Sequence, residues 1–275
     1  MHYDFLIADH VVRVEDATLA AHLTGFECNS ESTSALGPCD QGPICSVTRS
    51  SDPAQHGVER MDPAFPIHHV LTLTRHKSAV LLADDGFERA MARSCTAEGY
   101  ADLLLLAVYS RLTYYRTVFV HGALIEIPNV GGVMFVGRSG VGKTTQAELW
   151  QTYGDARVIN GDKVFLSVKD ECPDTVFAYG CPWNGSSPYR ENRRVPLKAI
   201  IDLKRDPEHH IRRLDDLEAL ITYMPSVFMP NWDTRLTEKV MDTLDLMMPR
   251  VPIYRMSCGL DRSGVDLVRG VLENL

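Results

Sequence analysis

The chain has 275 residues, of which 45% are hydrophobic and 23% charged, as is ordinary for a globular protein. Its formal net charge of −8 leaves no excess positive field to hold a polyanion, which argues against nucleic acid as a partner. The longest apolar run, residues 103–108, is far shorter than a membrane span, and the N-terminus lacks the features of a signal peptide, so we expect a cytoplasmic protein.

The first part of the chain predicts a small, mainly antiparallel β region over residues 1–96. Residues 3–15 are typical of a strand or a pair of strands, and residues 69–74 and 78–83 predict a hairpin. Between them, residues 27–64 are rich in Ser, Gly, Pro, Asp and Cys and predict loops. Cys28, Cys39 and Cys45 lie in or near these loops without the spacing of a zinc site, so we expect reduced thiols.

The second part, residues 97–275, predicts an α/β domain. A helix over 98–115 is expected to link the two parts. A strand over 118–127 and a turn at 128–132 lead to a buried strand at 133–136 and a helix over 145–153.

The remaining elements predict a mixed sheet. A short strand at 156–159 precedes a hairpin with arms at 164–168 and 175–179. The rest of the pattern predicts a buried strand, two helices, a strand and a final helix, at 196–203, 214–223, 236–248, 251–256 and from 261 onward.

The strand at 133–136 leads into the most specific motif of the chain. The segment fits G-x-x-x-x-G-K-[ST], the phosphate-binding loop, or P-loop. Glycines let successive backbone N–H groups surround phosphate oxygens, the lysine reaches the β- and γ-phosphates, and the hydroxyl that follows it suits Mg²⁺. We therefore expect ATP to bind at Gly137, Arg138, Ser139, Gly140, Val141, Gly142, Lys143, Thr144 and Thr145.

The surroundings of this motif resemble one family. A strand carrying His121, a tight turn, a second strand, the P-loop, a helix and then Asp162 after a short strand form the pattern of HPr kinase/phosphorylase and its PEP-carboxykinase-like relatives. Residues 160–163, 179–185 and 195–201 extend the similarity, which covers about 115–275 and is closest to the small HPr-kinase-related members. The resemblance implies a mixed-sheet P-loop kinase domain that uses ATP and Mg²⁺.

The resemblance also implies residue roles. Asp162 matches the catalytic acid and Mg²⁺ ligand, Thr144 the second metal ligand, and His121 a histidine near the transferred phosphate. Where the family usually has another acidic residue, this chain has Gly161. Either Asp162 serves as both metal ligand and base, or the base is missing. Asp202, which follows a buried apolar run, is a second candidate for the catalytic acid and metal ligand. The residues alone do not decide between Asp162 and Asp202.

Three arginines, Arg190, Arg193 and Arg194, are candidates for phosphate or acceptor contacts, because a guanidinium donates a planar fork of hydrogen bonds. The expected acceptor is a hydroxyl on a peptide, a protein or a small molecule, with residues 1–96 contributing to its recognition. Self-association into a homo-oligomer is left open.

Two other functions compete with the kinase. A GTPase would need N-K-x-D, which the chain lacks. A nucleotide-binding scaffold or regulator that has lost turnover is the remaining alternative, and Gly161 keeps it open.

Overall fold

The computed structural model describes residues 2–28, 42–50, 66–73, 75, 79–206 and 208–273. The chain forms two compact units, Met1–Tyr114 and Tyr115–Leu275. Helix α2 (Ala97–Leu112) packs against strands of the first unit, burying Leu103 and Leu104 there. The division between the units therefore follows this helix, whereas the sequence placed the boundary before it, at residues 96 and 97.

In the described part of the first unit, a six-stranded sheet has the order β1-β2-β3-β6-β5-β4. Its hairpins β1–β2 and β4–β5 confirm the strands predicted there. The sheet is mixed rather than antiparallel throughout, because β3 pairs in parallel with both β2 and β6. The elements of this unit besides α2 are β1 Tyr3–Ile7, β2 His10–Val14, α1 Ala17–Ala20, β3 Cys45–Arg49, β4 His69–Thr72, β5 Val80–Ala83 and β6 Arg89–Arg93.

Strand β3 falls in the segment 27–64 that composition predicted as loops. Its buried residues Cys45 and Val47 alternate with more exposed ones, a pattern too short to stand out beside the Ser- and Gly-rich residues around it. Residues 29–41 and 51–64 of the same predicted loop segment lie outside the described residues. Cys39 is among them.

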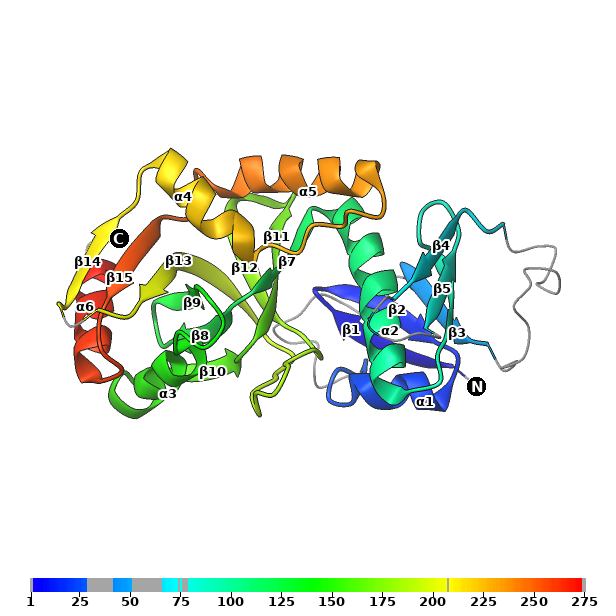
Figure 1. Ribbon diagram of the computed structural model, residues 1–275, viewed down its shortest axis with the longest axis horizontal. Helices are drawn as coiled ribbons and strands as arrows, with labels where there is room; N and C mark the ends of the chain where they lie inside the picture. Colours follow the sequence, from blue (N-terminus) through cyan, green and yellow to red (C-terminus); the bar gives the residue numbers. More distant parts are fainter. Residues whose placement is uncertain are drawn as a thin grey trace. The chain divides into compact units, whose positions relative to one another are not determined.

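The second unit is a mixed α/β domain (Figure 1). In its described residues the sheet follows the path β10-β8-β9-β13-β12-β11-β7, and β15 and β14 extend it from β13. Its strands are β7 Thr117–His121, β8 Ala123–Ile127, β9 Gly131–Val136, β10 Arg157–Asn160, β11 Lys163–Lys169, β12 Cys172–Gly180, β13 Arg194–Lys204, β14 His210–Arg213 and β15 Ile253–Ser257. Its helices are α3 Lys143–Tyr153, α4 Asp216–Tyr223, α5 Thr234–Met247 and α6 Arg262–Leu272.

Two layers of helices cover different parts of this sheet. Helices α3 and α6 pack together, and α3 covers β8, β9 and β10 (Figure 1). Trp150 of α3 and Val265 of α6 are fully buried in this core. Helix α5 packs on β7 and β11 with its buried apolar face. Among the described residues, no helix combines the length and apolar character that a membrane span requires.

The strand predicted over 118–127 is broken in the structure. Gly122 separates β7 from β8. The neighbouring antiparallel strand is interrupted at the same level, between β10, which pairs with β8, and β11, which pairs with β7. The backbone N–H of Gly122 donates to the carbonyl oxygen of Asp162 at 2.9 Å and holds the two breaks in register. Both strands are thus interrupted at the same point of the sheet, which is called the corner below. His121 and Asp162 lie at this corner.

A second edge is formed by parallel strands. β13 runs parallel to β9 on one side and to β15 on the other. In the β9–β13 register Val136 lies opposite Asp202, so the P-loop leaves the sheet beside the carboxyl end of β13. Loops that leave carboxyl ends of parallel strands at one edge commonly form ligand sites.

Candidate functional site

The P-loop has the backbone conformation that its glycines permit. Gly137, Gly140 and Gly142 have φ values of +133°, +75° and +110°, a region that residues with a Cβ atom rarely adopt. Helix α3 begins directly after them at Lys143, with Gly142 as its N-cap. Because the cap residue has no side chain, the first N–H groups of α3 face the loop and suit an anion. Arg138, Ser139 and Thr145 are exposed, and Val141 is half-buried.

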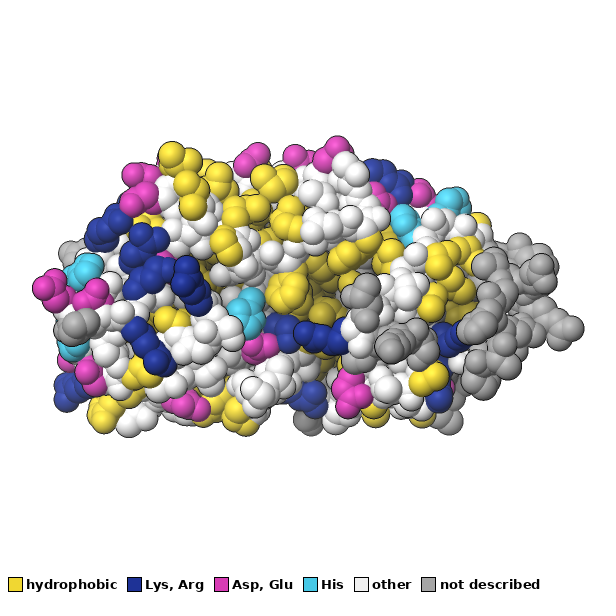
Figure 2. Space-filling view, in the orientation of Figure 1, with side chains coloured by type: hydrophobic (Ala, Val, Ile, Leu, Met, Phe, Trp, Pro, Cys, Tyr) yellow, Lys and Arg dark blue, Asp and Glu magenta, His cyan; other side chains and the backbone are white. Residues whose placement is uncertain are grey.

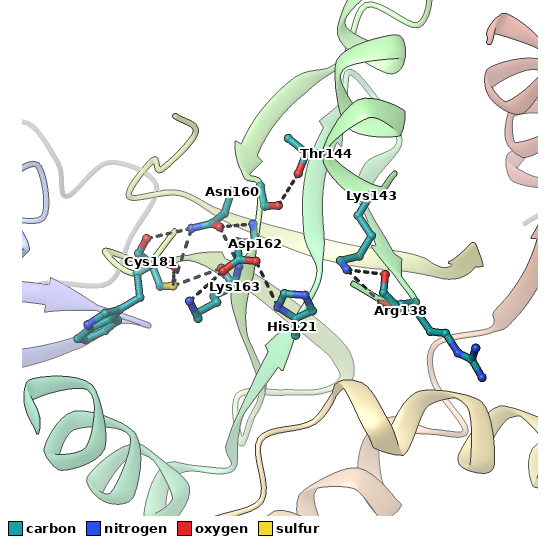
Figure 3. A network of polar contacts seen from close by, with 11 residues as sticks. His121, Arg138, Lys143, Thr144, Asn160, Asp162, Lys163 and Cys181 are labelled. Atoms are coloured by element: carbon teal, nitrogen blue, oxygen red, sulfur yellow. Dashed lines mark hydrogen bonds and ion pairs between the residues drawn. The ribbon is translucent and has the colours of Figure 1, made fainter. Parts of the chain in front are cut away.

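Lys143 is buried, with only 7% of its surface exposed. Its Nζ donates to the carbonyl oxygens of Gly137 at 3.1 Å and Arg138 at 3.3 Å (Figure 3). Burial lowers the pKa of Lys143, and the negative charge of Asp162 partly opposes this. The ammonium group is therefore held by the loop's own carbonyls, at the mouth of the turn that phosphate oxygens would enter.

Thr144 connects the start of α3 to the corner of the sheet. Its Oγ1 donates to the carbonyl oxygen of Gly161 at 3.0 Å. The next residue, Asp162, presents a carboxylate that Lys163 Nζ contacts at 2.8 Å and His121 Nδ1 at 3.3 Å (Figure 3). The structure therefore brings together His121, Lys143, Thr144 and Asp162.

Asn160 fixes the backbone at this corner. Its Oδ1 accepts from the backbone N–H groups of Asp162 and Lys163, each at 3.0 Å, and its Nδ2 donates to the carbonyl oxygen of Cys181 at 3.0 Å. Asn160 was not among the site residues predicted from the sequence. An Asn whose side chain accepts from the N–H two residues on forms an Asx-turn, and Asn-Gly-Asp is a sequence that favours it. That signal could have identified Asn160 as the residue that orients Asp162.

The surroundings of His121 favour its neutral form. Burial lowers its pKa, the positive charges of Lys143 and Lys163 lower it further, and the carboxylate of Asp162 acts in the opposite direction. A neutral imidazole can accept a proton, and the resulting positive charge would be stabilised by the carboxylate of Asp162.

The space that a side chain at position 161 would need is occupied by Ser187. A Cβ atom added to Gly161 would lie 1.9 Å from Ser187 Oγ and 3.5 Å from Thr144 Cγ2. Ser187 is held in turn by Tyr189, whose backbone N–H donates to Ser187 Oγ at 3.2 Å. An acidic side chain at position 161 would therefore displace Ser187, whose hydroxyl lies beside Gly161.

The same loop covers Asp162. A Cβ atom on Gly185, whose φ is +57°, would lie 2.4 Å from Asp162 Oδ2. Only glycine lets the loop backbone approach the carboxylate this closely. Trp183 is buried and packs edge-to-face against Phe165, with ring centroids 6.2 Å apart.

Asp202, the other claimant for the acidic role, is buried rather than a surface charge at a strand end. Its exposed fraction is 1%. Arg255 Nε lies 3.0 Å and Lys204 Nζ 3.3 Å from Asp202 Oδ2. Arg255 also donates to Thr222 Oγ1 at 2.7 Å, which links β15 to α4. Two cations already balance this carboxylate.

The three candidate arginines separate in the structure. Arg193 makes a bidentate ion pair with Glu126, which lies opposite Gly132 at the start of β9. Arg194 lies over the ring of Phe177, 4.9 Å from its centroid, at the start of β13. Because the P-loop leaves the other end of β9, both arginines lie away from the P-loop.

Arg190 remains near the corner. Its backbone forms a bridge with Asn160, and its Nη1 donates to the carbonyl oxygen of Pro182 at 3.3 Å. Other basic side chains gather over β13, β14 and β15 (Figure 2). They include Lys204, Arg212 and Arg255, of which Arg212 pairs with Glu218 at 2.7 Å.

No protein-family model and no curated protein matches the chain. Among solved structures, it matches the Hpr(Ser) kinase/phosphatase from Coxiella burnetii over 57% of this chain and 97% of that one, with 10% sequence identity and a TM-score of 0.32. This is a distant similarity of fold and assigns no activity. Functional conclusions for this chain depend on the geometry of its own residues.

Proposed function

We propose that the unit Tyr115–Leu275 binds ATP with Mg²⁺ at the P-loop and transfers its γ-phosphoryl group to a hydroxyl. One observation carries this proposal: the hydrogen bond from Thr144 to Gly161 holds the start of α3 next to Asp162. The group that clamps phosphate and the group that can take a proton from an acceptor therefore lie side by side. Phosphoryl transfer depends mainly on such positioning and on charge.

The residues divide the work as follows. The N–H groups of 137–142 and the start of α3 hold the phosphates, and Lys143 exchanges its carbonyl partners for the β- and γ-phosphate oxygens. Asp162 accepts the proton of the acceptor hydroxyl as the new O–P bond forms. The bond between the γ-phosphorus and the β–γ bridging oxygen breaks, and ADP leaves. His121 and Lys163 hold the carboxylate in place.

The donor set fits Mg²⁺. Throughout the described ranges, no group of three or more His, Cys, Asp or Glu side chains could hold a metal by itself. Mg²⁺ uses one or two carboxylates together with substrate phosphates and water, and Thr144 and Asp162 supply oxygens of the right kind. When bound, the ion would neutralise charge on the phosphates.

The test is nucleotide binding and ADP formation in Lys143→Ala. Calorimetry should show ATP affinity in Mg²⁺ reduced by on the order of 10² or more, because a charge-assisted contact to phosphate is lost. Lys198→Ala is the matched control. Lys198 is an exposed lysine of β13 that lies beside the start of β9, whereas the P-loop follows the end of β9. Equal ATP affinity in Lys143→Ala and Lys198→Ala would overturn the P-loop assignment.

A scaffold or regulator that binds nucleotide without turnover is the second candidate. Two observations favour it. Lys163 and His121 already contact the carboxylate of Asp162, and the chain has Gly161 where the resembled family usually has another acidic residue. ATP binding with no ADP formed in the presence of any acceptor would select this reading over the kinase.

For the acceptor, we propose a peptide or a small hydroxyl compound rather than HPr. The net charge of −8 disfavours a strongly acidic acceptor, and Arg193 is paired with Glu126. Labelled ATP should be offered with free serine, other small alcohols, serine-containing peptides and HPr. Phosphorylation of HPr alone would refute this assignment.

A further inference from the structure

An open pocket lies at the carboxyl ends of the parallel strands β13 and β15. Its volume is about 460 Å³, within the range of small-molecule sites. Two loops that follow these strands form it, and the residues that line it are Arg205, Asp206, Cys258, Gly259 and Leu260. The third strand of the parallel set, β9, ends at the P-loop itself.

The pocket shares a wall with the P-loop. Arg205 Nη2 donates to the carbonyl oxygen of Gly140 at 2.9 Å, and its Nε donates to that of Val141 at 3.1 Å. On the other side, a Cβ atom on Gly142 would lie 2.5 Å from Leu260 Cδ2. The pocket is therefore adjacent to the P-loop, and a molecule whose phosphates occupy the P-loop could extend into it.

We propose that this pocket takes the nucleoside part of the bound nucleotide, a purine base with its ribose. The proposal rests on nucleotide binding at the P-loop, the function proposed above, and names the second half of that site. None of the residues that line the pocket belongs to the phosphate-binding motif.

The chemistry of the lining suits a purine. Leu260 offers an apolar surface to a base, and the guanidinium plane of Arg205 is held by two hydrogen bonds and can stack on a ring. Burial raises the pKa of the Cys258 thiol to about 11, so this wall is uncharged. Asp206 is exposed and accepts from the backbone N–H of Glu208 at 2.9 Å. Its carboxylate can also accept from a ring amino group or a ribose hydroxyl.

The experiment compares ATP with inorganic tripolyphosphate, which has the phosphates and no nucleoside. Both are titrated calorimetrically, in Mg²⁺, into the full chain and into Leu260→Ala. The variant should weaken ATP about tenfold, the scale of lost apolar contact, and change tripolyphosphate affinity less than twofold. Leu217→Ala, which removes an exposed leucine of α4, is the matched control and should change neither. Asp206→Ala is a second variant, on an exposed side chain, and should also weaken ATP selectively.

Three outcomes would overturn the pocket assignment. Wild-type protein that binds tripolyphosphate as tightly as ATP would show that the nucleoside adds nothing, while the P-loop proposal would stand. Equal weakening of both ligands in Leu260→Ala, with Asp206→Ala unchanged, would assign Leu260 to support of the P-loop. Wild-type protein that binds neither ligand would overturn the pocket and the P-loop proposal together.

Discussion

Two aspartates at two edges of the same unit differ in almost every respect. Asp202 lies near the carboxyl end of the parallel strand β13, beside the P-loop, and it is buried and paired with Arg255 and Lys204. Asp162 lies where two neighbouring antiparallel strands are interrupted, its side chain is 23% exposed, and it contacts one lysine and one histidine. A carboxylate already balanced by two cations supports structure, whereas one that is partly open and next to a phosphate loop can bind a metal or take a proton.

The largest expected effect that sharpens this comparison is the loss of turnover in Asp162→Asn. The amide keeps the shape but neither accepts a proton nor carries the charge for Mg²⁺. Turnover should fall by on the order of 10² or more, with ATP binding retained. ADP formation over a range of Mg²⁺ concentrations measures it. Turnover within threefold of wild type would remove Asp162 from the reaction.

The next effect concerns the loop that covers Asp162. Gly161→Asp should lower the free energy of unfolding by about 1–3 kcal/mol, because its side chain overlaps Ser187. Urea unfolding measures this change. The double variant Gly161→Asp with Ser187→Gly should recover most of the loss, and a purely additive double variant would show that the overlap is absent.

At the other edge, Asp202→Asn should mainly affect stability. It leaves Arg255 and Lys204 without their charge partner, and the partial exposure of both cations limits the cost to about 1–2 kcal/mol. Asp266→Asn is the control, because its ion pairs with Arg262 and Arg269 are exposed and should be worth less than about 1 kcal/mol. Equal unfolding free energies for Asp202→Asn and wild type would contradict the structural role.

The smallest effect is a pH dependence carried by His121. Its pKa is lowered in the folded state, so as pH falls below its unfolded value of about 6.5 the unfolded chain binds the proton first. This contribution to stability is therefore present at neutral pH and lost on acidification. The difference in unfolding free energy between wild type and His121→Gln should shift in that direction between pH 7 and pH 5. In a Lys143→Ala background the shift should shrink, because a positive charge that lowers the pKa is gone.

Local sequence patterns predicted the helices and strands better than the contacts between them. The P-loop, its helix and most strands of the second unit follow from short-range periodicity and turn residues. The break at Gly122 was not predicted, because most of residues 118–127 are strand-forming and the prediction gave the isolated glycine no weight, although a glycine inside a strand pattern can mark a bend. Its partner in the structure, the carbonyl oxygen of Asp162, is remote in sequence. Strand β14 was missed for a related reason: its four residues are mostly polar, and its place is set by pairing with β15.

The site shows the same limit. His121, Lys143, Thr144 and Asp162 could be named in advance because each stands in a motif. The partners that decide what other residues do are remote in sequence: Arg193 reaches Glu126 and Arg255 reaches Asp202. Ser187 fills the space beside Gly161 from a loop further along the chain. No local spacing encodes these contacts.

The most direct test of the central claim is the rate of Mg²⁺-dependent ADP formation in Asp162→Asn and Asp202→Asn, measured side by side at saturating ATP. We expect Asp162→Asn to lose on the order of 10² or more and Asp202→Asn to stay within a few-fold of wild type. The reverse ranking would contradict the account, since it would place the chemistry at the carboxyl end of β13 and leave Asp162 as a turn residue.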